Sequence, residues 1–189
     1  MKHLMTCFWR RLDTPGSDVC RVFRLEDGWL LRGNAVFHEH GLGCALRYEA
    51  KADEHWNTRS AFVEGHCGER EILLDIRRLA PDSWQLNGEA AGLAEPCDDV
   101  DLGFTPATNI LALERMSLAI GESRACHSAW LDFPGLELQH LPQTYRRIDA
   151  EHYDYESPTA GYRGRLRVLP GGVVAVYPDL FELVALERA

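Results

Sequence analysis

The sequence predicts an all-β protein: a many-stranded antiparallel β-barrel or roll, in a single domain with very little helix. Apolar and polar residues alternate with a period of two along much of the chain, which is typical of half-buried strands in an antiparallel sheet. Turn signals such as Asp27-Gly28 and Asn87-Gly88 separate these runs, mostly at intervals of roughly 10 to 20 residues, as in a meander. A sheet with this many strands has to close or form layers to protect its edges.

The alternation is strictest in 45–53 and 71–77, where apolar residues occupy the even positions and mostly charged residues the odd ones. Residues 165–168 repeat the pattern near the end of the chain. A helix of a turn or two is expected only in 107–118, where apolar residues recur at helical spacing. The tail 180–188 fits a helix or a strand equally well.

Composition narrows the class of protein. The 189 residues include 20 basic and 29 acidic side chains, a net charge of −9. This balance argues against nucleic acid as a partner, because a phosphate-binding surface needs clustered Lys or Arg. No repeat or linker divides the chain, so we expect one domain over 1–189. No apolar stretch approaches the ~20 residues of a transmembrane segment and no signal peptide is visible, which predicts a cytoplasmic location. The sequence predicts no particular oligomeric state.

Motifs for catalysis, cofactors and metals are missing. The chain has no nucleophile elbow, phosphate-binding glycine loop or dinucleotide fingerprint, so we assign no catalytic residue and no cofactor. The six cysteines form no CxxC pair, which predicts six reduced and mostly buried thiols and no metal site. His38-Glu39-His40 has the i, i+2 spacing of a possible zinc ligand pair, but it precedes Gly41 at an expected hairpin tip, so a solvated loop is favoured.

A run of carboxylates is the most distinctive local feature. Asp98, Asp99 and Asp101 crowd into four positions, and no Lys or Arg occurs from Leu79 to Glu114. On a strand, Asp99 and Asp101 share one face. Uncompensated carboxylates repel each other, so we expect them to cap turn amides or to pair with a distant arginine. A polar anchor for a ligand and acid–base catalysis are the alternatives.

Aromatic residues beside polar ones form a second candidate site. Trp56 and Arg59 could stack on a sugar ring and donate hydrogen bonds, although a core Trp with Arg59 paired to Asp99 or Asp101 is favoured. Tyr145 and Tyr177 fall at strand positions, where packing in the core is favoured over lining a cavity.

Four motifs together resemble the bacterial family known as putative glycolipid-binding, formerly a domain of unknown function. The resemblance covers nearly the whole chain in the right order, and a departure follows Asn109, where relatives often read basic and this chain keeps one arginine, Arg115. It implies a single-domain β-barrel similar to lipoprotein-carrier folds, which hold acyl chains in a half-open barrel, and it carries over no catalytic residues. The motifs are Trp56-x-Thr58-Arg59; Asp99-Val100-Asp101-Leu102 with Thr105-Pro106-x-Thr108-Asn109; Pro134-x-Leu136 leading to Gln143-x-Tyr145; and Gly172-Val173-Val174-x-x-Tyr177-Pro178.

The sequence therefore predicts a non-enzymatic binding protein whose partner is a lipid or glycolipid. An apolar barrel interior would take an acyl chain, and a polar rim would meet the headgroup. One alternative is a hydrolase or isomerase of a small glycosylated or polar molecule that uses Asp99 and Asp101. Another is a protein that only self-associates through a sheet edge. The candidate ligand-binding residues are Trp56, Arg59, Asp99, Asp101, Asn109, Tyr145 and Tyr177.

Overall fold

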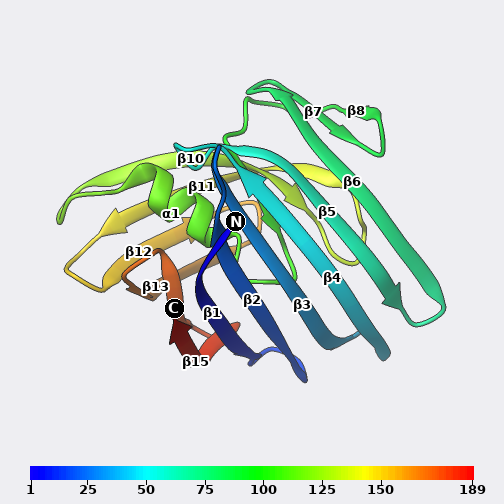
Figure 1. Ribbon diagram of the computed structural model, residues 1–189, viewed down its shortest axis with the longest axis horizontal. Coiled ribbons are helices and arrows are strands. Elements are labelled where there is room, and N and C mark those ends of the chain that lie inside the picture. Colours follow the sequence, from blue (N-terminus) through cyan, green and yellow to red (C-terminus); the bar gives the residue numbers. More distant parts are fainter.

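Fifteen strands form one continuous sheet that rolls up, with a single short helix packed inside it (Figure 1). The computed structural model describes residues 1–189. The elements are β1 (Lys2–Arg11), β2 (Gly16–Arg24), β3 (Trp29–Glu39), β4 (Leu42–Ala52), β5 (Thr58–Cys67), β6 (Arg70–Ala80), β7 (Ser83–Leu86), β8 (Glu89–Ala91), β9 (Asp99–Leu102), α1 (Asn109–Met116), β10 (Ser123–Leu131), β11 (Leu138–Arg147), β12 (His152–Ser157), β13 (Tyr162–Leu169), β14 (Val173–Tyr177) and β15 (Phe181–Arg188).

The strand order is β8-β7-β6-β5-β4-β3-β2-β1-β15-β14-β13-β12-β11-β10-β9. The chain therefore forms two series of neighbouring strands, β1–β8 and β9–β15. The pairing of β1 with β15 joins them into one sheet and brings the two termini together (Figure 1). β9 pairs with β10 in parallel, whereas the other neighbouring pairs run antiparallel. The predicted all-β roll with very little helix is confirmed.

The predicted alternation matches the burial of the strands. In 45–53, which lies in β4 and the residue after it, the even positions are buried, and so are the even positions of 71–77 in β6. Leu166 and Val168 on β13 are buried in the same way. These side chains point toward the other half of the sheet, and their charged neighbours face outward.

The structure contains the helix expected in 107–118 and shows that the tail 180–188 includes a strand. The segment 107–118 contains α1, which ends at Ser117 in the left-handed region (φ 44°). At 8 residues, this helix is much too short to span a bilayer, and the chain holds no other. The tail 180–188 contains β15, because it pairs with β14 on one side and β1 on the other.

The interior between the two halves is filled. A continuous apolar core of 44 buried residues connects β1–β8 with β9–β15, and Trp9, Tyr48 and Phe104 are among its largest fully buried side chains. Edge strand β9 lies against β5, where the Val100 amide donates a hydrogen bond to Thr58 Oγ1 at 3.0 Å. The open apolar interior expected for an acyl chain is thus occupied by core side chains.

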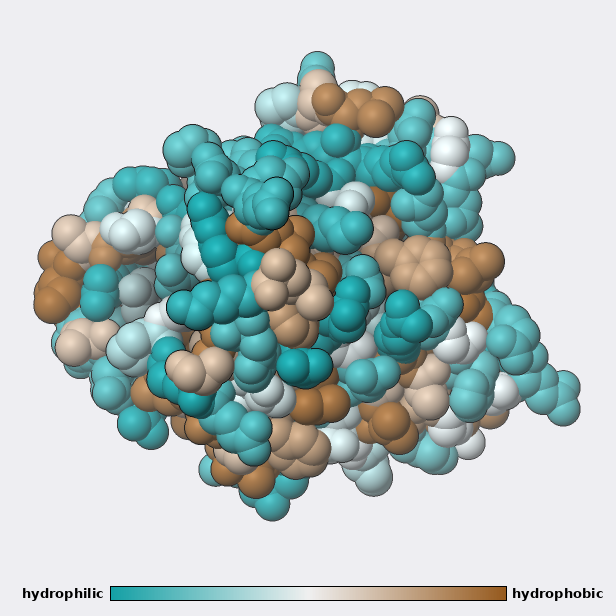
Figure 2. Space-filling view, in the orientation of Figure 1, coloured by the Kyte–Doolittle hydropathy of each residue, from teal (hydrophilic) through white to brown (hydrophobic).

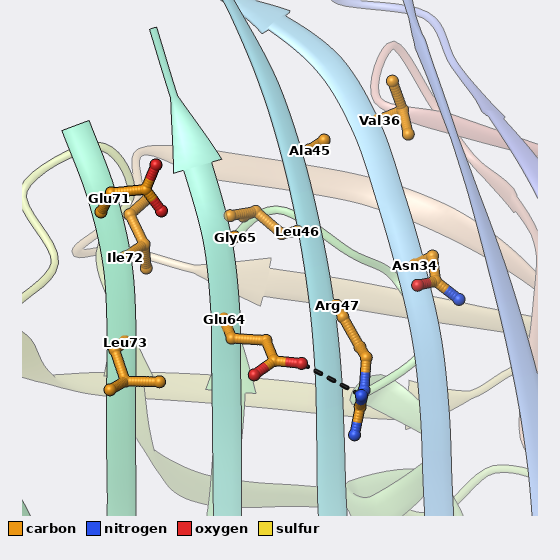
Figure 3. A pocket seen from close by; sticks show the side chains of 10 residues that line it. All are labelled: Asn34, Val36, Ala45, Leu46, Arg47, Glu64, Gly65, Glu71, Ile72 and Leu73. Carbon is orange, nitrogen blue, oxygen red and sulfur yellow. Dashed lines mark ion pairs between the residues drawn. The ribbon is translucent and has the colours of Figure 1, made fainter. Parts of the chain in front are cut away.

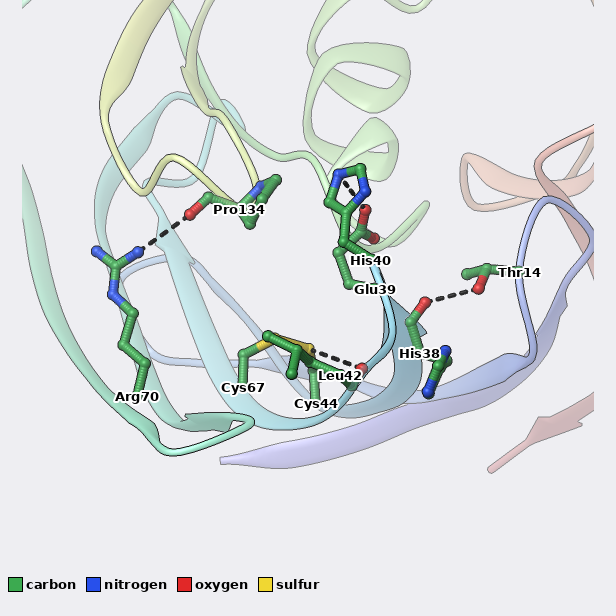
Figure 4. Close-up of a disulfide and its surroundings, with 9 residues drawn as sticks. All are labelled: Thr14, His38, Glu39, His40, Leu42, Cys44, Cys67, Arg70 and Pro134. Atoms are coloured by element: carbon green, nitrogen blue, oxygen red, sulfur yellow. Dashed lines mark hydrogen bonds and ion pairs between the residues drawn. A yellow bond between two sulfur atoms is a disulfide. The ribbon is translucent and has the colours of Figure 1, made fainter.

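One expectation about the cysteines is wrong. Cys44 on β4 and Cys67 on β5 lie directly opposite each other and form a disulfide, while the other four cysteines are free and buried (Figure 4). The two are 23 residues apart in sequence, and only the register of the β4–β5 hairpin brings them together. His38 and Glu39 end β3, so the loop expected over 38–40 holds only His40; the two histidine side chains are exposed.

Candidate functional site

A small cavity lies on the inner face of the C-terminal half of the sheet. Its volume is about 190 Å³, and two of its lining residues, Gly103 and Ala160, are exposed and mark its mouth. We call it the inner cavity. Its lining residues are Asp101, Gly103, Thr105, Asn109, Trp130, Leu141, Tyr155, Ala160, Tyr162, Tyr177, Leu180 and Phe181.

Strand pleating explains why these side chains converge. Asp101 on β9 pairs in register with Trp130 on β10, so both point to the same face. Tyr155 on β12 and Tyr177 on β14 line the cavity from neighbouring strands of the same half of the sheet. The helix contributes Asn109 at its first turn. Counting Tyr162 on β13 and Phe181 on β15, seven separate elements supply polar or aromatic side chains to the lining.

Asp101 is the one carboxylate that lines the inner cavity. Gln143 Nε2 donates a hydrogen bond to its Oδ2 at 2.8 Å, and no lysine or arginine pairs with it. Burial raises the pKa of Asp101 to about 6, although the hydrogen bond from Gln143 opposes this rise and the charge of Asp99 adds to it. Asp101 keeps some accessible area because its side chain faces the cavity.

A buried hydrogen-bond chain supports the floor of the cavity. Asn109 Nδ2 donates to the hydroxyl of Tyr145 at 2.9 Å, and that hydroxyl donates to Gln143 Oε1 at 3.4 Å. Tyr145 is fully buried and does not line the cavity. It therefore positions Asn109 and Gln143, which fix the orientation of the polar groups that a ligand would meet.

Aromatic rings form the cavity wall. Tyr155 and Tyr177 meet edge to face, with ring centroids 5.7 Å apart and planes at 81°. Tyr162 meets Tyr177 at 5.0 Å and 70°. Trp130 completes the wall beside Gly103, where an added Cβ would lie 2.6 Å from the indole Nε1. Rings at these angles present both faces and edges to a bound group.

A second buried carboxylate lies behind the cavity. Asp18 on β2 is 1% exposed and accepts hydrogen bonds from Thr105 Oγ1 and from the Tyr48 hydroxyl, the latter at 2.8 Å. Its Oδ1 has no hydrogen-bond partner. Burial raises the pKa of Asp18 to about 7, against the lowering effect of these hydrogen bonds. Thr105 connects Asp18 to the inner cavity, since it lines the cavity itself.

Asp99 belongs to a structural ion pair. Arg115 on α1 donates from Nη2 to Asp99 Oδ2 at 2.7 Å and from Nε to both carboxylate oxygens at 3.2 Å. Asp98 lies 3.5 Å from the same guanidinium. The expected distant arginine is therefore Arg115, which follows the run in sequence and returns to it through the helix. Asp99 does not line the inner cavity.

The prediction that Arg59 pairs with Asp99 or Asp101 is wrong. Arg59 pairs with Asp27 at 2.5 Å, and both side chains are largely exposed. Its neighbour Thr58 points inward to β9, so alternation turns Arg59 outward. Trp56 stacks on Trp29 at 4.0 Å in the β4–β5 connection.

The seven predicted site residues thus divide into groups. Asp101, Asn109 and Tyr177 line the inner cavity, Tyr145 supports it, and Asp99 anchors the helix. Trp56 and Arg59 do not line it. Sequence reasoning missed Trp130, Tyr155, Tyr162 and Phe181 as lining residues; the alternation of Tyr153, Tyr155 and Ser157 was the available signal for β12.

Several larger hollows are grooves on the outer surface. One of about 630 Å³ crosses the outward face of β3–β6, where Val36, Ala45 and Leu73 flank the ion pair of Arg47 and Glu64 (Figure 3). Its walls are strand surfaces with no opposing layer. The face seen in Figure 2 is largely hydrophilic, with hydrophobic residues in separate small groups. The inner cavity is distinguished from these grooves by its convergent polar and aromatic groups.

Comparison with known proteins gives one family, and similar solved structures include the following two. The family model described as "Putative glycolipid-binding" matches residues 6–183. A DUF1089 family protein from Pseudomonas aeruginosa is 28% identical, with a TM-score of 0.76, and the match covers 87% of this chain and 90% of that one. A β-barrel-like protein of DUF1849 from Brucella abortus shares the fold, with 9% identity, a TM-score of 0.61 and coverage of 100% and 98%. No curated protein matches the chain significantly.

Proposed function

The chain belongs to the family described as "Putative glycolipid-binding", and from this premise we propose that the inner cavity binds the sugar headgroup of a glycolipid. The observation that carries the proposal is the lining of the cavity. Asp101 and Asn109 offer polar atoms next to the rings of Trp130 and Tyr177. A sugar has hydroxyl groups for the first kind of partner and an apolar ring face for the second.

The size of the cavity supports a headgroup in place of a whole lipid. About 190 Å³ is below the roughly 300–1,000 Å³ of pockets for drug-sized ligands, so one sugar ring or a group of similar size is the fitting occupant. An acyl chain attached to it would leave through the mouth beside Gly103 and Ala160. The acyl chain would then lie against the outer surface of the protein or in a membrane, because core side chains fill the interior.

Binding is favoured over the enzymatic alternative for a geometric reason. Glycoside hydrolysis by two carboxylates needs both groups beside the bound sugar. Asp101 faces the inner cavity, whereas Asp99 is 1% exposed and held by Arg115. The carboxylate of Asp101, the amide of Asn109 and the aromatic rings suit binding of a sugar better than its hydrolysis.

Two tryptophan variants test the proposal against the earlier rim hypothesis. Octyl glucoside serves as the probe, and its binding is measured by isothermal titration calorimetry. Trp130→Ala should weaken binding at least about tenfold, which corresponds to ~1.4 kcal/mol. Trp56→Ala is the matched control outside the cavity and should leave binding within about twofold. The reverse pattern, or no binding of the probe by the wild-type protein, would overturn the proposal.

Thermal unfolding of both variants controls for loss of the fold. Native mass spectrometry of protein purified from its own host gives an independent readout. A retained glycolipid mass that disappears in Trp130→Ala supports the proposal, and a clean unliganded mass in the wild type argues against it.

A further inference from the structure

The charge balance of the inner cavity carries information about its ligand. Asp101 lines the cavity without a cationic partner. Its charged neighbour along β9, Asp99, is negative as well, and Arg115 is already engaged by Asp99 and Asp98. A carboxylate in such a place is stabilised only when hydrogen bonds or an opposite charge replace the lost water.

A second carboxyl group lies behind the same cavity. Asp18 is almost fully buried, has no cationic partner, and leaves its Oδ1 without a hydrogen bond. Thr105, which donates to Asp18, also lines the cavity. The cavity thus has Asp101 in its lining and Asp18 behind Thr105. Burial raises the pKa of both carboxyl groups, and a nearby positive charge would stabilise the charged form of each.

The cavity wall suits a cation for an independent reason. Ring faces carry negative charge density, and cages of Tyr and Trp bind ammonium groups. Trp130, Tyr155, Tyr162 and Tyr177 supply four such rings around the cavity, and Tyr177 meets both Tyr155 and Tyr162 edge to face.

Arg11 is the guanidinium that contacts the wall. It lies over the ring of Phe181, 5.5 Å from its centroid, and over Phe37 at 4.7 Å. Asp13 accepts hydrogen bonds from it at 3.0 and 2.6 Å. Its charge is thus matched by Asp13 and leaves that of Asp101 uncompensated.

We propose that the headgroup bound in the inner cavity carries a positively charged ammonium group, held between the Asp101 carboxylate and the aromatic wall. This inference rests on the proposed function and names the chemistry of its ligand. Lipid headgroups carry two kinds of ammonium group: a primary one, as in an amino sugar, and a quaternary one, as in choline. The carboxylate supplies a charge-assisted hydrogen bond to the first, and the rings suit both.

Matched probes test the charge. At pH 7, calorimetric titrations of the full chain with glucosamine and glucose compare one ring with and without an amine. Glucosamine should bind at least about tenfold more tightly than glucose. Choline is the third probe: tighter binding of choline than of glucosamine identifies the quaternary amine as the source, and the reverse identifies the amino sugar.

Asp101→Asn should abolish this preference, because it removes the charge and keeps an acceptor for Gln143. Asp82→Asn, at an exposed position away from the cavity, is the control for net charge and should keep it. Equal binding of glucosamine and glucose by the wild type would overturn the inference, as would a preference that survives Asp101→Asn or the failure of every amine to bind. The wild-type comparison decides the matter even if Asp101→Asn unfolds. If the protein binds octyl glucoside but does not prefer glucosamine to glucose, this inference fails and the proposed function stands.

Discussion

Replacing Arg115 by methionine should destabilise the protein strongly, because it strands the carboxylate of Asp99. The guanidinium makes three contacts of 2.7–3.2 Å with that carboxylate, whose side chain is 1% exposed, while Arg115 itself is 16% exposed. Breaking a buried ion pair from one side costs about 3–5 kcal/mol, since the remaining charge has no water to solvate it. At roughly 2–4 °C per kcal/mol for a chain of this size, the midpoint of unfolding should fall by about 6–20 °C.

The assay is thermal unfolding at pH 7 and pH 5. Arg115→Met should lose less stability at pH 5, because the stranded Asp99 can take up a proton there and become neutral. Asp99→Asn combined with Arg115→Met should recover part of the loss, since no unpaired charge remains at that position.

Arg59→Ala is the matched control. It removes an arginine from the exposed pair with Asp27 and should leave the unfolding midpoint unchanged within error. The reasoning is refuted if Arg115→Met and Arg59→Ala have equal effects, or if the effects of Asp99→Asn and Arg115→Met are simply additive.

Three further outcomes are expected. The disulfide between β4 and β5 predicts four free thiols in the denatured, unreduced protein and six after reduction; six before reduction would contradict the bridge. Burial raises the pKa of Asp18 to about 7, so the folded state holds its proton more tightly than the unfolded chain. The free energy of unfolding should therefore fall as pH rises from about 4 to 7. Asp18→Asn should flatten this slope, and an unchanged slope would contradict the raised pKa. Gly103→Ala should displace the indole of Trp130 and weaken binding of octyl glucoside while far-ultraviolet circular dichroism stays the same; unchanged binding would show that the indole position is unimportant.

The fold was largely predictable because each strand carries its own signal. A side-chain period of two marks a half-buried strand in residues such as 45–53 whatever its neighbours are. The tail 180–188 has no such clear period, and its pairing with β1 decides its structure. The register of β4 and β5 is likewise a property of the hairpin, so the disulfide of Cys44 and Cys67 was out of reach.

The candidate site was predictable only in part because it depends on which segments meet. The carboxylate run was recognised from the sequence. That Asp99 forms an ion pair while Asp101 lines the cavity depends on where α1 places Arg115. Trp56 and Arg59 carry suitable chemistry for a sugar, yet Trp56 stacks on Trp29 against the core and Arg59 faces solvent, both away from the cavity. The spacing of residues along the sequence does not indicate which distant segments meet in the folded protein.

The most direct test of a headgroup site in the inner cavity is nuclear magnetic resonance of the five tryptophan indole N–H groups during titration with octyl glucoside. The indole of Trp130 lines the cavity, so its resonance should shift most, and assignment follows from its absence in Trp130→Phe. Trp56, stacked on Trp29 away from the cavity lining, should stay nearly unchanged. A titration in which Trp56 moves and Trp130 does not would contradict the account.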